Sequence, residues 1–163
     1  SEIILAEKIG LGNYCDFWMH NGLMEDSEGK LSKSRGERIT LEEVFTDCPP
    51  PALRFYLLGF HYRDFTPYSP EGLLEACQEG ERLGVNAVDC MVEEPSDPRE
   101  DEETAPLVTK FEDALSDDLD TPRTLDVLRE LDVIAGNRLK NKGDIGPISG
   151  MYSVFQCVLG VFS

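Results

Sequence analysis

The stretch from Lys30 to Gly36, Lys-Leu-Ser-Lys-Ser-Arg-Gly, holds the residue types best suited to phosphate chemistry in this sequence. Lys30 and Lys33 stand three residues apart, so their ammonium groups can meet neighbouring phosphate oxygens. Ser32, Ser34 and the backbone N–H groups near Gly36 add uncharged donors. The pattern predicts a mobile cationic clamp for a polyphosphate, used in catalysis. The alternative is a solvated turn, the commoner role of a Lys/Ser-rich loop.

Other segments, in a fixed order along the chain, extend this loop into a longer pattern. They are Glu2-Ile3, Phe17-Trp18-Met19-His20-Asn21-Gly22, Leu53 to Leu58 followed by His61-Tyr62-Arg63, Tyr68 to Leu73, and Asp117-Asp118-Leu119-Asp120-Thr121-Pro122. The loop resembles the KMSKS signature of class I aminoacyl-tRNA synthetases. The surrounding segments narrow the resemblance to the cysteinyl-tRNA synthetase family, because chance agreement of five segments is far less probable than that of one.

The resemblance implies a mainly α fold with three parts. Residues 1–38 would be the C-terminal edge of a Rossmann-like α/β catalytic domain that carries the KMSKS-type loop. Residues 39–68 would be connecting helices of the stem-contact type. Residues 69–163 would form an antiparallel helical bundle of the tRNA-binding type, interrupted by an acidic linker at 93–104.

The resemblance also implies a cysteine–tRNA ligase. Such an enzyme activates cysteine with ATP and Mg²⁺ to cysteinyl-adenylate and passes the cysteinyl group to tRNA(Cys). Lys33, followed by Lys30, is then the catalytic candidate, since a lysine that meets the departing pyrophosphate lowers the barrier. Ser32 and Ser34 would help both lysines to hold the ATP phosphates. ATP, cysteine and tRNA(Cys) are the expected partners.

Zinc is the cofactor that the family uses to recognise the cysteine thiol, through two cysteines, a histidine and a glutamate. Glu2 aligns with that glutamate, and the other ligands match no residue of this chain. The H-I-G-H signature that completes the ATP grip is also absent. We therefore expect this chain alone to be inactive and to bind zinc weakly. A fragment, a truncated product and one piece of a split enzyme all remain open.

Two other functions compete with the tRNA ligase. The related ligase of mycothiol synthesis joins cysteine to an amino sugar, and Arg35, Leu119 and the chain terminus favour it. Glu2-Ile3 and the segment 17–22 favour the tRNA enzyme. The third possibility is a helical tRNA-docking or interaction module that retains only synthetase ancestry. The acceptor separates the two enzymes, and tRNA binding by this chain alone would support the module.

Composition places few further bounds on the chain. A length of 163 residues with 40% hydrophobic residues suffices for a packed core. The sequence holds no apolar run of eighteen residues and no charged-then-apolar leader, so we expect a cytoplasmic protein without a membrane partner. Five irregularly spaced cysteines argue for reduced, mostly buried thiols rather than a disulfide framework.

A net charge of -17 opposes a general nucleic-acid-binding face, so we expect no DNA partner and only local RNA contacts. We also expect the protein to be a monomer. One group of basic residues lies in the phosphate loop. The second group, Arg138, Lys140 and Lys142, ends a predicted helix, where it either pairs with the helix dipole or contacts the tRNA backbone. The acidity is also typical of adaptation to a salty cytoplasm.

Periodicity and capping residues predict the remaining elements. Residues 2–12 favour a short helix, and 14–19 and 22–25 favour strands. Thr40 with Glu43 predicts a capping box for a helix over 41–45, and the prolines at 49–51 begin the next helix, over 52–60. Further helices are expected after the Ser69 cap, with an apolar stripe from Leu73 to Met91, and then over 106–116, from 121, and over 148–162. The segment 93–104 is expected to be exposed and disordered, and His20 and His61 to be structural.

Overall fold

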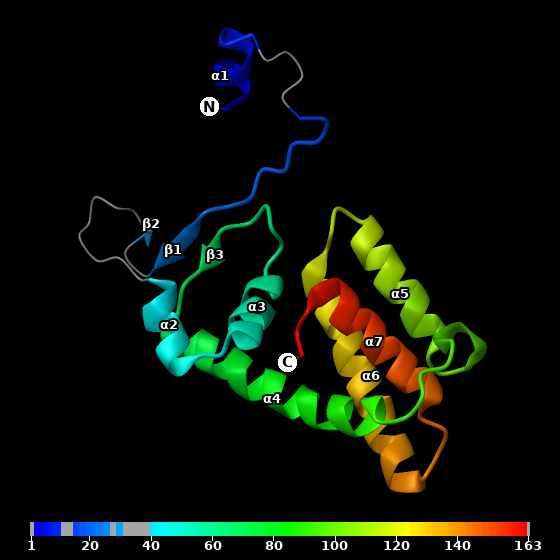
Figure 1. Ribbon diagram of the computed structural model, residues 1–163. Helices are drawn as coiled ribbons and strands as arrows, with labels where there is room; N and C mark the ends of the chain where they lie inside the picture. The colour runs from blue at the N-terminus through cyan, green and yellow to red at the C-terminus, as the bar shows by residue number, and fades with distance from the viewer. Residues whose placement is uncertain (1, 11–14, 27–28, 31–39, 163) are drawn as a thin grey trace.

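The computed structural model of the protein describes residues 2–10, 15–26, 29–30 and 40–162, and these are mainly helical (Figure 1). This agrees with the predicted fold class at the level of a mainly α chain. The elements in order are α1 Glu2–Lys8, β1 Met24–Asp26, β2 Gly29–Lys30, α2 Leu41–Asp47, α3 Pro50–Leu58, β3 Thr66–Pro67, α4 Pro70–Met91, the 3₁₀ helix η2 Pro98–Glu100, α5 Ala105–Ser116, α6 Thr121–Asn141 and α7 Gly146–Leu159.

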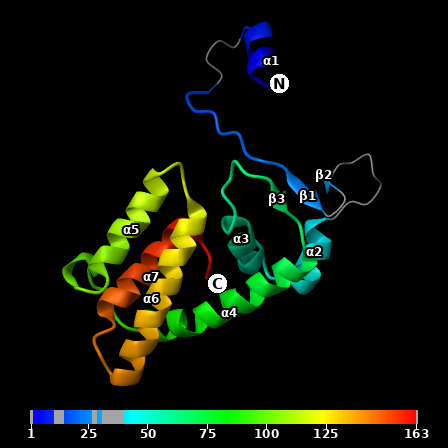
Figure 2. The ribbon, with the colours of Figure 1, turned by 180° about the vertical axis from the view of Figure 1, so that it is seen from behind.

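The N-terminal segment is the most loosely connected of the described parts. Helix α1 lies apart from the other elements in both Figure 1 and Figure 2, and Ile4, Leu5 and Ile9 are more than half exposed. The strand predicted over 14–19 is wrong for the residues described there, because 15–19 form no strand. A strand needs to pair with a neighbouring strand, and the described sheet is built from 24–26, 29–30 and 66–67, not from 15–19.

A sheet of three short strands follows, in the order β2-β1-β3. The middle strand, β1, pairs antiparallel with β2, where Glu25 faces Lys30, and parallel with β3, where Met24 faces Thr66. The strand predicted over 22–25 thus begins two residues later, at Met24. The sheet joins the segment before the phosphate loop to the chain that follows α3.

The local signals around α2, α3 and α4 are confirmed. Thr40 caps α2 with Glu43 in a capping box, and Pro49 caps α3, with prolines in its first turn. Ser69 caps α4 by accepting a hydrogen bond from the backbone N–H of Gly72, and Pro70 opens its first turn. In each case a side chain or a proline deals with N–H groups that a helix start leaves unpaired.

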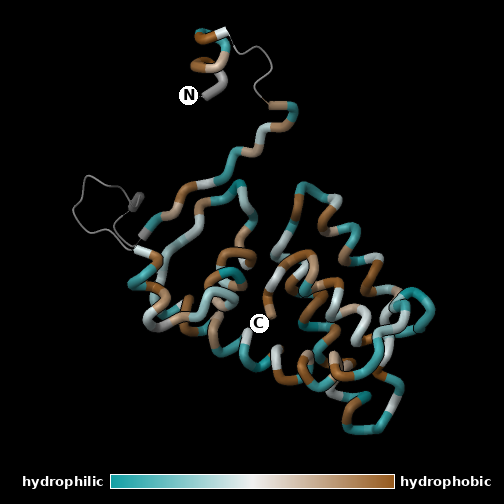
Figure 3. Tube along the Cα trace, in the orientation of Figure 1, coloured by the Kyte–Doolittle hydropathy of each residue, from teal (hydrophilic) through white to brown (hydrophobic). Residues whose placement is uncertain are grey.

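Helix α4 packs against α3, α6 and α7, and α5 packs against α6 (Figures 1 and 2). Apolar and polar residues alternate along these helices, as Figure 3 shows, and the apolar ones meet in a single core. Phe111 of α5 and Phe155 of α7 contact each other edge to face at 4.8 Å between ring centres. Side chains that are completely buried in this core include Leu83, Leu128, Leu131, Ile148, Met151, Tyr152 and Phe155.

Part of the predicted apolar stripe on α4 is wrong. Leu73, Cys77, Leu83 and Ala87 are buried as expected, but Val88 is 63% exposed and Met91 is 39% exposed. Helix α4 runs on for 22 residues, and these two side chains lie toward its C-terminal end on a face that no described element covers. Periodicity identifies the apolar residues of α4, but it does not show which of them pack against another element.

The segment 93–104 is ordered, so the prediction of a disordered linker is wrong. It contains η2, and Pro98 and Thr104 are buried, with the Thr104 hydroxyl donating to the Pro98 carbonyl oxygen at 2.7 Å. Asp101 accepts hydrogen bonds from Arg138 on α6 at 2.8 Å. The acidic residues do not simply repel one another, because an arginine and backbone N–H groups neutralise part of their charge.

Candidate functional site

The predicted phosphate loop is described only at its edges. The backbone of Lys30 lies in β2, while Ser32, Lys33 and Ser34 fall outside the described residues. The backbone of Glu2, the predicted zinc ligand, lies in α1, but its side chain is also outside the description. The structure therefore shows how the two ends of the loop are held.

The N-terminal end of the loop is held by pairing between β1 and β2. Glu25 faces Lys30 and Asp26 faces Gly29 in an antiparallel register. Antiparallel pairing fixes both the position and the direction of the chain that enters the loop. The backbone of Lys30 therefore starts from a defined place beside the middle strand.

The C-terminal end of the loop is held by the capping box of α2. The backbone N–H of Thr40 donates to the Glu43 carboxylate at 2.8 Å, and the backbone N–H of Glu43 donates to the Thr40 hydroxyl at 3.2 Å. These two bonds satisfy donors that the first turn of a helix leaves without partners. Helix α2 thus begins at a fixed point, at Leu41, one residue after its cap Thr40.

The segment 62–68 supports the sheet from the other side. The N–H of Gly22 donates to the Tyr62 carbonyl oxygen at 2.7 Å, and the N–H of Tyr68 donates to the Glu25 carbonyl oxygen at 2.6 Å. A Cβ atom at position 22 would lie 1.7 Å from the Asp64 carbonyl oxygen, so only glycine fits there. This contact explains the glycine that ends the sequence motif at 17–22.

Tyr56 connects α3 to this strand segment. Its hydroxyl donates to the Pro67 carbonyl oxygen at 2.5 Å and accepts from the backbone N–H of Ser69 at 3.3 Å. Burial raises the pKa of the Tyr56 hydroxyl above its ordinary value, although the Ser69 contact acts in the opposite direction. The hydroxyl therefore stays protonated and links α3, β3 and the start of α4.

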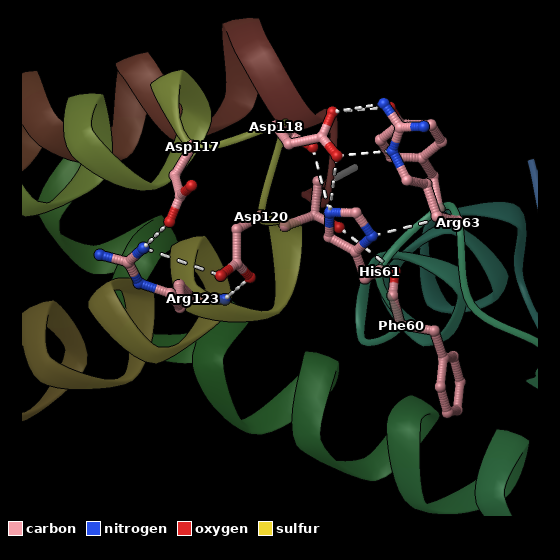
Figure 4. A network of polar contacts seen from close by, with 9 residues as sticks. Phe60, His61, Arg63, Asp117, Asp118, Asp120 and Arg123 are labelled. Atoms are coloured by element: carbon pink, nitrogen blue, oxygen red, sulfur yellow. Dashed lines mark hydrogen bonds and ion pairs between the residues drawn. The ribbon is translucent and has the colours of Figure 1, made fainter. Parts of the chain in front are cut away.

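A second polar cluster joins the turn after α3 to the turn between α5 and α6 (Figure 4). Arg63 donates to both carboxylate oxygens of Asp118, from Nε at 2.5 Å and from Nη2 at 3.0 Å, and the Tyr62 hydroxyl donates to Asp118 at 2.7 Å. The hydrogen bonds from Arg63, followed by that from Tyr62, lower the pKa of the Asp118 carboxyl to about 2. This carboxylate remains charged at every physiological pH.

Backbone atoms and a histidine complete the junction. His61 Nε2 lies 3.1 Å from the Asp118 carbonyl oxygen, and the Thr121 hydroxyl donates to the Phe60 carbonyl oxygen at 3.4 Å. Asp118 and Leu119 both have left-handed φ angles, of 55° and 58°. Residues other than glycine rarely adopt this conformation, which indicates that the contacts at the junction impose it. His61 thus has the structural role expected of it.

The sequence identified both motifs of this junction but missed that they meet. The sequence places 61–63 in the connecting unit 39–68 and predicts a helix from 121, and it predicts no contact between them. The available signal was charge complementarity, since Arg63 and Asp118 are opposite charges in two short motifs. Only the path of α4 and α5, which brings the two turns together, decides that they pair.

In the second basic group, Arg138, Lys140 and Lys142, the arginine is paired with carboxylates of the same chain. Arg138 has a side chain that is 14% exposed, and it donates to Asp101, to Glu103 and to the Asp144 carbonyl oxygen. This guanidinium therefore stabilises the acidic segment 93–104. Neither of the two roles predicted for it, helix-dipole pairing or contact with a tRNA backbone, accounts for these bonds.

Comparison with known proteins decides the family. Residues 2–78 match the family described as tRNA synthetases class I (C) catalytic domain. A protein of Pelobacter propionicus named cysteine–tRNA ligase is 31% identical to the whole chain, which spans 38% of that protein. A protein of the same name from Thioalkalivibrio sulfidiphilus is 32% identical, again over the whole chain and 35% of its own length. This chain belongs to the cysteinyl-tRNA synthetase family.

The chain spans only part of the length of its relatives in the cysteinyl-tRNA synthetase family. The relative from Methylococcus capsulatus, also named cysteine–tRNA ligase, is 34% identical over 80% of this chain but 28% of its own length. The chain thus spans about a third of the length of the curated relatives that it matches. The match to the catalytic-domain family includes the loop, the sheet, α2, α3 and the first part of α4.

Neither a zinc site nor a membrane span is found within the described ranges. Those residues contain no group of three or more histidines, cysteines, aspartates or glutamates placed to hold a metal ion. The residues present therefore do not by themselves fit the zinc site of the cysteinyl-tRNA synthetase family. Among the helices of the described chain, none combines the length and the apolar character needed to cross a membrane.

Proposed function

We propose that the protein carrying this chain is a cysteine–tRNA ligase, and that this chain contributes its KMSKS-type loop and the elements that support it. The observation that carries the proposal is that both ends of the loop are fixed, by the β1–β2 pairing at Lys30 and by the Thr40–Glu43 capping box. A loop that must meet a transition state needs fixed ends around its moving part. Relatives named cysteine–tRNA ligase supply the substrate class.

In the proposed reaction, a carboxylate oxygen of cysteine attacks the α-phosphorus of ATP. The bond from that phosphorus to the bridging oxygen breaks, and pyrophosphate leaves with the negative charge. Lys33, assisted by Lys30, stabilises this charge as it develops, and Ser32 and Ser34 donate to the phosphate oxygens. A hydroxyl of the terminal ribose of tRNA(Cys) then attacks the activated carbonyl carbon, and AMP leaves.

The proposed domains follow the sequence motifs. Residues 1–38 would close a Rossmann-like catalytic domain, residues 39–68 would connect it, and residues 69–163 would form the helical bundle. Mg²⁺ would accompany ATP as part of the substrate. Zinc would bind Glu2 only together with ligands from outside this chain. The zinc ion would then supply a soft partner for the thiol of the cysteine substrate.

Charge pairing favours this enzyme over an independent tRNA-docking module. A module must offer unpaired lysines and arginines to the RNA phosphates. Within the described residues, however, these side chains largely contact carboxylates of the same chain, and the chain as a whole carries a net charge of -17. The basic side chains that are paired in this way are Arg63, Arg82, Arg99, Lys110, Arg123, Arg129 and Arg138.

An acceptor assay tests the function directly. The polypeptide that carries this chain is incubated with ATP, labelled cysteine and either a tRNA(Cys) transcript or the amino-sugar acceptor of mycothiol synthesis. We expect label in acid-precipitable tRNA and none in the amino sugar. Transfer to the amino sugar alone would replace the proposal with the related ligase. A tRNA transcript that binds tightly to the isolated chain without any transfer would support the docking module instead.

A further inference from the structure

Two buried cysteines contact each other between α2 and α4. The thiol of Cys77 donates to the Cys48 sulfur, with 3.2 Å between the two sulfur atoms, and 29 residues separate the pair. Cys48 ends α2 and is 2% exposed, while Cys77 lies within α4 and is 8% exposed. Nothing in the proposed aminoacylation chemistry uses either thiol.

The separation of the sulfur atoms is close to that of a disulfide. An S–S bond is about 2.05 Å long, so the two sulfurs need to approach by about 1.2 Å. Side-chain rotation at a helix end can supply such a shift, because Cys48 is the C-terminal cap and has an extended backbone. All five cysteines are free, and among the described residues the sulfur–sulfur hydrogen bond joins only Cys48 and Cys77.

Two cavities give a small oxidant access to the pair. A cavity of about 390 Å³ lies between α2 and α4 and is lined by both Cys48 and Cys77, together with Tyr68 and Leu73. A second cavity, of about 480 Å³, reaches Cys77 from the side of α3 and the C-terminal segment. Cys77 thus lines both cavities, and it is the more exposed residue of the two, at 8% against 2% for Cys48.

We propose that Cys48 and Cys77 are a site of reversible oxidation, and that a small uncharged peroxide such as hydrogen peroxide converts them to an intramolecular disulfide. The Cys77 sulfur attacks one peroxide oxygen and becomes a sulfenic acid, and the other oxygen leaves as water with the thiol proton. The Cys48 sulfur then attacks the Cys77 sulfur, and the sulfenic oxygen leaves as a second water. Two thiols lose two electrons, and one peroxide gains them.

Burial sets the speed of this reaction. Desolvation raises the pKa of the Cys48 thiol to about 12, and the hydrogen bond from Cys77 contributes in the same direction. A thiol with so high a pKa is rarely a thiolate at neutral pH, so the second step, in which Cys48 attacks the Cys77 sulfenic acid, is slow compared with that of an exposed redox sensor. The site would respond to sustained oxidation rather than to a brief pulse.

The disulfide would tie the end of α2 to α4. Helix α2 follows the phosphate loop, with its cap at Thr40, four residues after Gly36, so the bond would hold the element next to the loop. This consequence for the loop rests on the proposed function, whereas formation of the bond does not. A failure of the disulfide test would therefore leave the proposed ligase untouched.

Mass spectrometry tests the proposal on the full chain with Cys157→Ser, which removes the exposed thiol that could link two molecules. After incubation with hydrogen peroxide under native conditions, we expect a monomer that is about 2 Da lighter and a Cys48–Cys77 linked peptide that dithiothreitol separates. Cys48→Ala and Cys77→Ala, each in the same background, should lose the linked peptide. Sulfinic acid on either cysteine without a link, or no change after many hours, would overturn the proposal.

Thermal unfolding provides a second measurement that needs no substitution at the pair. A cross-link that closes a loop of this length restricts the unfolded chain, so the oxidised protein should melt at least about 5 °C above the reduced one. Dithiothreitol should abolish the difference. A linked protein that melts no higher than the reduced form would show that the bond forms only by distorting the contact between α2 and α4.

Discussion

Arg63 and Asp118, 55 residues apart, are joined by two hydrogen bonds that hold the turn after α3 against the turn between α5 and α6. Because the turn after α3 continues into β3 beside β1, this pair links the supports of the phosphate loop to the helical part of the chain. Both side chains are about half exposed, so solvent screens the pair and its geometry matters more than its energy.

Asp118→Asn should loosen this junction without unfolding the protein. The amide keeps the shape but loses the charge that Arg63 and Tyr62 contact, so we expect a fall in melting temperature of about 1–3 °C. Hydrogen exchange should show faster opening at residues 60–64. Asp117→Asn, on the neighbouring residue, is the matched control and should leave residues 60–64 unchanged. Equal effects of the two variants would remove the special role of Asp118.

The junction should weaken only in strong acid. The pKa of Asp118 is about 2, below its ordinary value of 3.8, and a lowered carboxyl pKa adds stability above the ordinary value that is lost as the pH falls toward 2. Carbon-detected NMR titration of the Asp118 carboxyl should therefore give a midpoint near 2. In Arg63→Met, the midpoint should move up toward 3.8. A midpoint near 3.8 in the unmodified protein would mean that the pair does not form in solution.

Tyr56→Phe should destabilise the support of the loop. The change leaves the Ser69 N–H and the Pro67 carbonyl oxygen without their partner in a partly buried place, which costs about 1–2 kcal/mol. Urea unfolding should show this loss. Tyr68→Phe is the control, since the structure gives the Tyr68 hydroxyl no hydrogen bond within the described chain. If Tyr68→Phe costs as much as Tyr56→Phe, the hydroxyl of Tyr56 is not the connection we describe.

Asp132 on α6 should be the most sensitive carboxylate of the core. It is 4% exposed and accepts hydrogen bonds from Arg82 at 2.8 Å and from Asn86 at 2.9 Å, and the Tyr152 hydroxyl lies 3.5 Å away. Asp132→Ala leaves these donors unpaired and should cost about 2–4 kcal/mol. Asp126→Ala, an exposed carboxylate on the same helix, should cost less than about 1 kcal/mol in the same urea experiment.

Local signals in the sequence were sufficient for the helix starts. Thr40 with Glu43 and Ser69 with Gly72 form side-chain caps between residues three apart, and prolines occupy the first turns of α3 and α4. Such signals are reliable because the partners are neighbours in the chain, so no knowledge of the tertiary fold is needed to pair them.

The contacts that the sequence did not predict are those between distant residues. The ordered segment 93–104 depends on Arg138, which reaches it from α6 across 37 residues. The contact between Cys48 and Cys77, and that between Arg63 and Asp118, likewise depend on how α4 and α5 are placed. Composition describes such residues as acidic, apolar or basic, whereas the path of the chain decides which of them meet.

The measurement that tests the account most directly is cysteine-dependent exchange of labelled pyrophosphate into ATP by the polypeptide that carries this chain. Lys33→Ala should slow the exchange by more than about tenfold and leave the melting temperature unchanged, since it removes a charge that is used only as pyrophosphate leaves. Lys140→Ala, a lysine in the last turn of α6, is the control and should exchange at the normal rate. An unchanged rate in Lys33→Ala would contradict the catalytic role of the loop.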